Sequence, residues 1–222
     1  MSNSVFVDIG NSFTKWHYED SYFKTPTNNF EFSDLPSVSK VWSSNVSSKI
    51  FKEYEADVFF INAQKKYKSL ESSYKNPSQL GSDRWLAMIA SYEISQNKSF
   101  IVLDIGTAIT IDLVEKGVHK GGLIAPGLSL IQSTINAFPC IEISGINNLG
   151  SSTEDAWSIG TNYMAISFIN RKIDEILSHF PNADINITGG GFNYLKNYLD
   201  FNHNYYDNLV LDGIELYAEY MG

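Results

Sequence analysis

Cysteine is almost absent from this sequence, with Cys140 the only one among 222 residues. A single cysteine cannot form an internal disulfide, and Cys140 has no cysteine or histidine neighbours at the spacing of metal ligands. We therefore expect Cys140 to be a small buried hydrophobe in a protein from a reducing compartment. The four histidines are also scattered without ligand spacing, which argues against a zinc enzyme.

A long apolar segment is missing as well. No apolar run approaches the roughly 20 residues needed to span a bilayer. The N-terminus has no basic stretch leading into an apolar core, so it is not typical of a secretion signal. Positive charge is scarce: the chain has 16 basic and 25 acidic residues and a net charge of −9. This negative charge opposes adhesion to nucleic acid and anionic membranes. We expect a soluble, cytoplasmic protein that binds neither.

Hydrophobic residues, in contrast, are plentiful: 43% of the chain is hydrophobic and 14% is aromatic, enough for a substantial core. In residues 81–97 apolar positions recur at three-to-four spacing, which predicts a helix capped by Ser82 or Asp83. Strands alternate with helices along the chain, which is typical of an α/β protein. The other expected elements are strands at 38–44, 56–62 and 183–188, a glycine-rich turn at 121–127, and helices at 128–138, 154–179 and from about Asp212.

One pattern occurs twice. VFVDIGNSFTK at 5–15 aligns with IVLDIGTAITI at 101–111, and each copy reads as an apolar strand, a turn of small polar residues and a second strand. Such an internal repeat suggests a duplicated domain. We expect an N-terminal domain at 1–98 and a C-terminal domain at 99–222, each sending one aspartate-bearing turn towards a shared cleft.

The first copy has the chemistry of a phosphate and metal site. Asp8 lies at the carboxyl end of its strand, where one carboxylate with water and substrate phosphates can hold Mg2+. Gly10 permits close approach of a ligand. The turn also offers donors and a positive charge for phosphate oxygens, from Asn11, Ser12, Thr14 and Lys15. The alternative is a β-turn in which Asp8 and Asn11 bond their own backbone, and the existence of a second copy weighs against it.

The second copy differs in its polar residues. Thr107 replaces Asn11, Ile111 stands where Lys15 does, and Asp112 adds an acid. This turn therefore suits cation and hydroxyl contacts better than phosphate charge, with an ordinary hairpin turn as the alternative.

The stretch GSDR at 81–84 lies at the expected start of a helix, where backbone N–H groups and the helix dipole favour an ionised Asp83. Such a carboxylate can accept the proton of a substrate hydroxyl, and Arg84 can bind a carboxylate or phosphate through two parallel hydrogen bonds. The alternative is an ordinary acidic first turn followed by an exposed arginine.

The glycines of TGGGFNYL at 188–195 could let adenine and ribose lie against bare backbone, although a plain strand-to-helix turn has the same composition. Two common nucleotide motifs are missing: the chain has no GxxxxGK[ST] loop, and TGGGFNYL is not GxGxxG.

Five motifs, taken in order, resemble those of type III pantothenate kinases, bacterial enzymes of the acetate-kinase, sugar-kinase, Hsp70 and actin superfamily. They are DIGNSFTK at 8–15, YKNPSQLGSDRW at 74–85, LDIGTAITID at 103–112, GGLIAPG at 121–127, and STEDA at 152–156 with Gly160. The resemblance covers the whole chain. It implies an α/β protein with two duplicated ribonuclease-H-like domains, as in actin-like ATPases, around a cleft.

The resemblance also implies which residues bind ATP and cations. Asp8 to Lys15 become the ATP-phosphate segment, with Asp8 near Mg2+. Asp104 corresponds to the ligand of a monovalent cation, K+ or NH4+, and Thr107 to an ATP contact.

The pantothenate contacts follow from the same resemblance. They are Tyr74, Gly81, Ser82, Asp83, Arg84 and Thr153. Asp83 is implied to be the proton acceptor, and Thr153 to come from the partner subunit of a homodimer or from a neighbouring helix. Because phosphoryl transfer passes through a loose transition state, Asp83 needs only to orient the hydroxyl and take its proton late, and an unperturbed or lowered pKa is compatible with that role.

The implied activity is ATP-dependent phosphorylation of pantothenate to 4'-phosphopantothenate, the first step of coenzyme A biosynthesis. The alternatives are a non-catalytic relative that acts in transcriptional regulation and a superfamily kinase for another small hydroxyl compound. The chain departs from the family pattern at Ser12, where threonine is usual, at Trp157, where isoleucine is more frequent, and in its shorter length.

Overall fold

A computed structural model of the chain describes residues 4–51, 54–95, 98–134 and 148–222. Cys140 and residues 135–138 of the helix expected at 128–138 lie outside these ranges.

The chain forms two compact units. Unit 1 comprises Met1–Ser99, Asp112–Gly121 and Asn208–Gly222, and unit 2 comprises Phe100–Ile111 and Gly122–Asp207. The boundary expected between residues 98 and 99 lies one residue before the first of these breaks, and two later segments group with the N-terminal residues. The end of the N-terminal ribonuclease-H-like domain at residue 98 stays a prediction.

Unit 1 contains a five-stranded sheet in the order β3-β2-β1-β4-β5. β1 pairs antiparallel with β2 and parallel with β4, which in turn pairs parallel with β5. The strands expected at 38–44 and 56–62 are confirmed as β4 and β5. The bounds are β1 Ser4–Ile9, β2 Phe13–Tyr18, β3 Ser21–Pro26, β4 Lys40–Asn45 and β5 Asp57–Phe60.

Side chains of β1 alternate between the two faces of this sheet. Val5, Val7 and Ile9 are fully buried in a cluster with residues of β4 and of the segment that follows β3. The other members of this cluster are Phe30, Phe32, Leu35 and Val41. Asp8 lies on the opposite face from these apolar residues.

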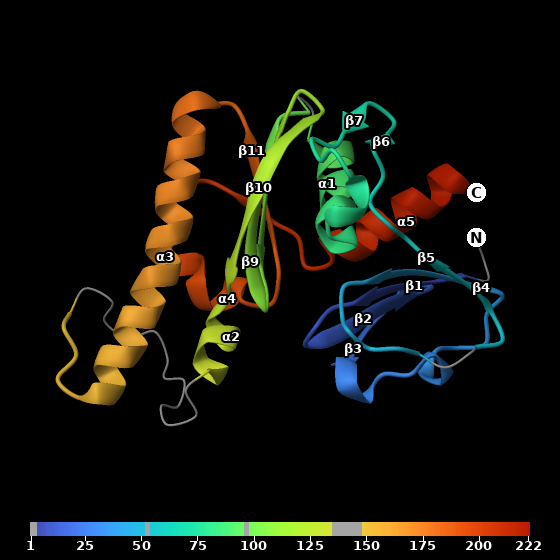
Figure 1. Cartoon of the computed structure of the whole chain (residues 1–222), viewed down its shortest axis with the longest axis horizontal. Coiled ribbons are helices and arrows are strands. Elements are labelled where there is room, and N and C mark those ends of the chain that lie inside the picture. Colours follow the sequence, from blue (N-terminus) through green and yellow to red (C-terminus); the bar gives the residue numbers. More distant parts are fainter. Residues whose placement is uncertain (1–3, 52–53, 96–97, 135–147) are drawn as a thin grey trace. The chain divides into compact units, whose positions relative to one another are not determined.

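Two helices complete unit 1. α1, Ser82–Ile94, packs along α5, Leu209–Met221, and both contact the sheet (Figure 1). The approach is close at Gly213, where an added Cβ would lie 2.1 Å from the carbonyl oxygen of Leu86. Both expected helices are therefore confirmed, and residues near the C-terminus form part of unit 1.

Short elements connect these parts of unit 1. They are the 3-10 helices η1 Thr27–Asn29, η2 Phe32–Asp34 and η3 Pro77–Gln79, and the strands β6 Lys66–Tyr67 and β7 Leu70–Glu71.

A second sheet has the order β12-β11-β8-β9-β10-β7-β6. Its strands β8, β11 and β12 belong to unit 2, where β11 pairs parallel with both β8 and β12. The strand expected at 183–188 is confirmed as β11. The bounds are β8 Phe100–Ile105, β9 Ala108–Glu115, β10 Val118–Pro126, β11 Asp184–Thr188 and β12 Asn204–Tyr205.

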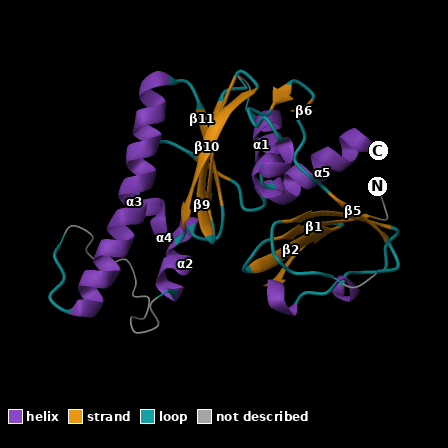
Figure 2. Ribbon diagram, viewed as in Figure 1, coloured by secondary structure: helices purple, strands orange, loops and turns teal. Residues whose placement is uncertain are grey.

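The long helix of unit 2 is α3, Thr153–His179, which confirms the helix expected at 154–179 (Figure 2). It begins where the Ser152 side chain accepts a hydrogen bond from the backbone N–H of Asp155, a typical N-cap. The remaining helices of this unit are α2 Leu128–Ser133, α4 Phe192–Leu195 and η4 Lys196–Tyr198.

Two local expectations were wrong. Residues 121–126 are not a turn but the end of β10, and the strand accommodates Gly121 at a φ of +121°. The N-cap of α1 is Gly81, and no side chain caps it. The hydroxyl of Ser82 contacts Ser44 instead, and Asp83 accepts a hydrogen bond from its neighbour Arg84.

None of the helices in the described ranges is both long and apolar enough to cross a membrane.

Candidate active site

Thr27 stabilises the turn after β1 through two hydrogen bonds. The Thr27 hydroxyl donates to the carbonyl oxygen of Gly10 at 2.7 Å, and its backbone N–H donates to the carbonyl of Ser12 at 3.0 Å. The fully buried Thr14 hydroxyl lies 3.1 Å from that of Thr27. The predicted phosphate residues therefore divide into two groups: Asn11 and Ser12 are exposed at the turn, while Thr14 lies inside and supports it.

Asp8 and Lys15 are register partners on β1 and β2. Both side chains are partly buried at the end of the hairpin, so an acid and a base flank the turn. A single partly buried carboxylate beside exposed hydrogen-bonding groups fits Mg2+ that carries water and substrate phosphates.

The start of α1 is fastened to the strand next to Asp8. The hydroxyl oxygens of Ser82 and Ser44 are 2.8 Å apart, and Ser44 is the register partner of Asp8 in the parallel pair of β1 and β4. Ser82 directly precedes the predicted proton acceptor Asp83. Within unit 1, its hydrogen bond to Ser44 therefore links Asp83 to the strand next to the one that carries the predicted magnesium ligand Asp8.

Burial determines the ionisation of Asp83. Burial raises the pKa of its carboxyl and the charge of Asp112 raises it further, while the backbone N–H and the charge of Arg84 lower it, and the net shift is upward. The helix start was expected to favour the ionised form of Asp83, but desolvation outweighs it and shifts the pKa the other way. A raised pKa makes Asp83 a stronger proton acceptor when it is ionised.

Arg84 is not exposed. Its Nε donates to Oδ2 of Asp112 at 2.8 Å and its Nη2 to Oδ1 at 2.5 Å, while Nη1 donates to the Tyr74 hydroxyl at 3.2 Å. Burial alone would lower the pKa of Arg84, but the hydrogen bonds and charge of Asp112 outweigh it and the net shift is upward. Asp112, which the sequence suggested for a cation-binding turn, is thus the partner of the arginine in GSDR.

In unit 2, three glycine-bearing segments surround Asp104 and Thr107. A Cβ on Gly189 would lie 2.3 Å from Oδ1 of Asp104, and a Cβ on Gly127 would lie 2.2 Å from the carbonyl oxygen of Gly106. The backbone N–H of Gly127 donates to the carbonyl of Thr107 at 2.9 Å. Gly127 and Gly189 therefore have no space for a side chain, whereas Gly190 next to them faces open space. This bare backbone beside the Asp104 carboxylate forms a cradle that fits a nucleotide or a cation.

Tyr205 adds a neutral hydroxyl near this cradle. Burial, the hydrogen bond to Asp207 at 2.6 Å and the charges of Asp207 and Asp104 raise the pKa of Tyr205 to about 12. The tyrosine therefore stays protonated at neutral pH.

Thr153, the remaining predicted contact, is exposed at the first residue of α3.

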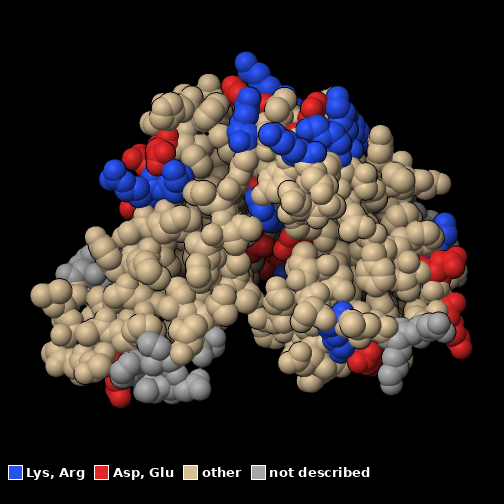
Figure 3. All heavy atoms as spheres, in the orientation of Figure 1, with Lys and Arg blue, Asp and Glu red and all other residues tan. Residues whose placement is uncertain are grey.

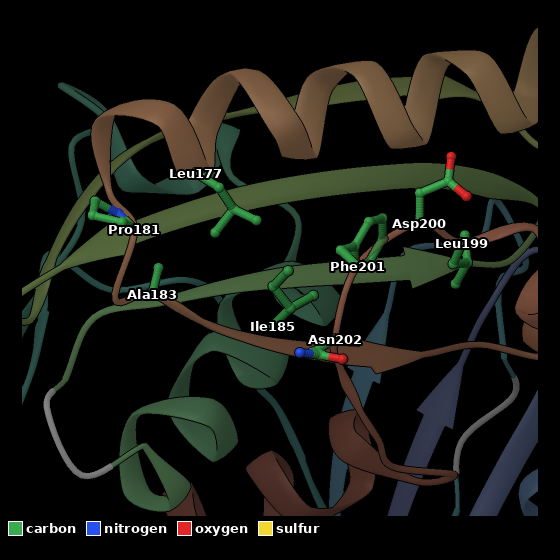
Figure 4. A pocket seen from close by; sticks show the side chains of 8 residues that line it. All are labelled: Leu177, Pro181, Ala183, Ile185, Leu199, Asp200, Phe201 and Asn202. Carbon is green, nitrogen blue, oxygen red and sulfur yellow. The ribbon is translucent and has the colours of Figure 1, made fainter.

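An open depression of about 550 Å³ lies elsewhere in unit 2, between the end of α3, β11 and residues 199–202 (Figure 4). None of the predicted site residues lines it.

Among the described residues, no group of three histidine, cysteine, aspartate or glutamate side chains is arranged to hold a metal ion. The predicted cation sites therefore rest on the single carboxylates of Asp8 and Asp104.

Lysine side chains gather over β6 and β7, with acidic side chains among them (Figure 3). Lys66 pairs with Glu71 at 3.2 Å and Lys68 with Glu93 at 2.9 Å. Exposed pairs of this kind contribute little to stability, and they partly neutralise this group of cations.

Comparison with known proteins decides the family. The family model of type III pantothenate kinases matches residues 23–175. The chain belongs to this family. The type III pantothenate kinase of Hahella chejuensis is 32% identical, with 96% of this chain and 95% of that protein covered. That of Pseudoalteromonas atlantica is 30% identical, with 96% of each covered. Membership in the type III pantothenate kinases confirms the expected kinase class and its place in coenzyme A biosynthesis.

Solved structures confirm the fold. A Campylobacter jejuni protein proposed to be a Baf family transcriptional activator aligns with a TM-score of 0.58 at 24% identity, covering 98% of this chain and 96% of that one. Component A of (R)-2-hydroxyglutaryl-CoA dehydratase from Acidaminococcus fermentans aligns with a TM-score of 0.53 at 8% identity, covering 100% of both chains. The α/β architecture with ribonuclease-H-like domains, as expected for a type III pantothenate kinase, is therefore correct.

Proposed function

We propose that the protein transfers the γ-phosphoryl group of ATP to the primary hydroxyl of pantothenate, giving 4'-phosphopantothenate. The observation that carries the proposal is the Ser44–Ser82 contact, because it holds the helix start with Asp83 beside the strand that bears Asp8. A proton acceptor and a phosphate-binding turn within one unit are the two parts that phosphoryl transfer to a hydroxyl requires.

Each residue has a role in this mechanism. Asp83 orients the pantothenate hydroxyl and takes its proton, helped by the raised pKa. The exposed Asn11 and Ser12 and the nearby Lys15 hold phosphate oxygens. Asp8 would hold Mg2+, which neutralises phosphate charge when it is bound. In unit 2, Thr107 would contact ATP.

A monovalent cation, K+ or NH4+, is proposed to bind at Asp104. The carboxylate packs on the bare backbone of Gly189, and the neighbouring Gly190 faces open space, which a cation or a nucleotide group could occupy. Neutralisation of Asp104 would remove a repulsion between its carboxylate and phosphate oxygens.

A homodimer is proposed as the working form. Tyr163 and Met164 of α3 are large apolar side chains that are 57% and 53% exposed, and contact with another chain would cover them. Thr153 begins the same helix, so a partner that packs on α3 would bring a second copy of this residue to the interface. Thr153 would then complete the pantothenate site of the partner subunit.

The proposed activity is tested by ATP consumption with pantothenate, in the presence and absence of K+. Turnover that depends on pantothenate and ceases in Asp83→Asn is the expected result. A matched control is Asp212→Asn, because Asp212 is also an acid in the first turn of a helix of unit 1 with a pKa raised by burial. Turnover unchanged in Asp83→Asn would exclude Asp83 as the proton acceptor.

The alternatives give different results in that assay. A transcriptional regulator would consume no ATP with pantothenate, and a kinase for another hydroxyl compound would respond only to that compound. Retention of Asp8, Asp83, Arg84 and Asp104 supports the kinase, because a non-catalytic relative has no need of all four.

A further inference from the structure

The buried edge of Arg84 is fully used within the protein. Nε and Nη2 form two parallel hydrogen bonds to the carboxylate of Asp112, and the two side chains are 6% and 1% exposed. This fork is the edge that binds carboxylates bidentately. A substrate carboxylate can therefore reach Arg84 only from its other edge, which Nη1 and the second N–H of Nη2 form.

His119 is the third member of this buried group. Its Nε2 lies 2.9 Å from Oδ1 of Asp112 and its Nδ1 lies 3.3 Å from the hydroxyl oxygen of Ser73. An ionised carboxylate only accepts hydrogen bonds, so Nε2 carries a hydrogen. His119 thus connects Asp112 on β9 to the segment that contains Tyr74.

Tyr74 is held by both neighbours. Its ring lies nearly parallel to that of His119, with centroids 5.9 Å apart and an interplanar angle of 12°. Its hydroxyl oxygen accepts a hydrogen bond from Nη1 of Arg84 at 3.2 Å. A tyrosine oxygen that accepts in this way can still donate its own hydrogen to a ligand.

We propose that His119 is a positioning residue for the carboxylate end of the substrate. It holds Asp112 and the Ser73–Tyr74 segment so that Nη1 of Arg84 and the Tyr74 hydroxyl present two adjacent donors to one carboxylate. This inference rests on the proposed function, since it takes pantothenate as the substrate. It adds Tyr74 to the arginine contact expected from sequence, so that Arg84 and Tyr74 share the carboxylate.

The contacts of His119 predict which kinetic constant its loss changes. His119 acts on the carboxylate end, whereas Asp83 acts on the hydroxyl, so loss of His119 changes binding of pantothenate more than the rate of phosphoryl transfer. The ATP-binding residues are not in this network, so the KM for ATP should stay constant.

The test compares two variants and two substrates. His119→Leu removes both ring nitrogens, while His119→Gln can restore an N–H donor to Asp112. In His119→Leu, the KM for pantothenate should rise about 10- to 100-fold, the range for a lost hydrogen bond involving charged groups, with a smaller change in kcat. In His119→Gln, most of that rise should disappear. With an analogue that has an alcohol in place of the carboxylate, the KM should be the same in all three proteins.

The control is His17→Gln, which removes another histidine–carboxylate contact of unit 1, that to Glu215 at 3.7 Å. It should leave both KM values unchanged. Equal rises in KM for pantothenate and the alcohol analogue in His119→Leu would overturn the positioning role. If His119→Leu fails to fold, Ser73→Ala serves instead, since it removes the Nδ1 contact, and a pantothenate-selective rise is again required. Absence of pantothenate turnover in the unaltered protein would overturn the proposed function itself.

Discussion

The hydroxyl oxygens of Ser44 and Ser82 lie 2.8 Å apart, although 38 residues separate them in the sequence. Ser44 is also the register partner of Asp8. One buried hydrogen bond thus fixes the start of α1 relative to the strand that ends in the phosphate turn. The spacing between the proton acceptor and the phosphate site depends on this contact.

The first prediction concerns Ser44→Ala. It should lower kcat about tenfold, because the start of α1 loses its attachment beside Asp8, and destabilise unit 1 by about 1 kcal/mol. Steady-state kinetics and thermal unfolding measure both effects. Ser43→Ala is the matched control, since Ser43 is equally buried on the same strand but its hydroxyl donates to the carbonyl of Ser44. An equal loss of kcat in both variants would contradict the assignment.

The second prediction concerns the stability of Asp83→Asn. Burial raises the pKa of Asp83 above its unfolded value, so its stabilising contribution is present below the unfolded pKa and is lost as pH rises through the folded pKa. At a pH above the folded pKa the ionised group is therefore unfavourable, and Asp83→Asn should raise Tm by about 2–4 °C there. The gain should vanish when the protein is heated at a pH near 4. A lower Tm above the folded pKa would show that the carboxylate is stabilised in the folded protein.

The third prediction concerns Thr27→Val. Loss of the hydroxyl removes its contacts with Gly10 and Thr14, so the turn loosens and the KM for ATP should rise about tenfold while the KM for pantothenate stays constant. Thr27→Ser keeps the hydroxyl and should behave as the unaltered protein. An unchanged KM for ATP in Thr27→Val would mean that the turn is held by its backbone contacts alone.

The fourth prediction concerns Asp104→Asn. If Asp104 binds the monovalent cation, this variant should lose at least about tenfold of the stimulation by K+, since a neutral amide does not offset the cation's loss of water. The measurement is the initial rate against K+ concentration, with choline chloride keeping ionic strength constant. Stimulation of the same size in both proteins would place the cation elsewhere.

The fifth prediction concerns the source of Thr153. Asp83→Asn and Thr153→Ala should each be poorly active, but subunits exchanged between them would form dimers with one intact site. Because half of the randomly assembled dimers are mixed and each has one such site, activity should recover to about a quarter of the unaltered level. Activity that does not rise on mixing would show that Thr153 acts within its own chain.

Local patterns in the sequence predicted much of the fold. β1, α1 and α3 could be predicted because the apolar pattern of each lies within its own short segment of the sequence. The GGLIAP segment was misassigned because glycine is typical of turns, whereas here strand pairing accommodates Gly121 at positive φ. The strand order and the grouping of residues into units depend on contacts between distant segments, which periodicity does not contain.

The candidate site was predictable in part for the same reason. Asp8 and Asp83 were found because their motifs are contiguous. The contacts from Arg84 to Asp112 and from Ser44 to Ser82 join residues 28 and 38 positions apart, so no local pattern indicates them. The pKa of Asp83 was misjudged because the sequence shows the helix start but not the burial that outweighs it.

The close packing of Gly213 against Leu86 has a consequence for synthesis of the chain. α1 and β1 leave the ribosome early, but α5, which covers both, follows only after residues 122–207. The apolar surfaces of α1 and β1 that α5 covers therefore stay exposed until residues 122–207 have been synthesised. Unit 1 becomes a complete folding unit only when its last helix emerges, so the half that carries Asp8 and Asp83 is the later of the two to mature.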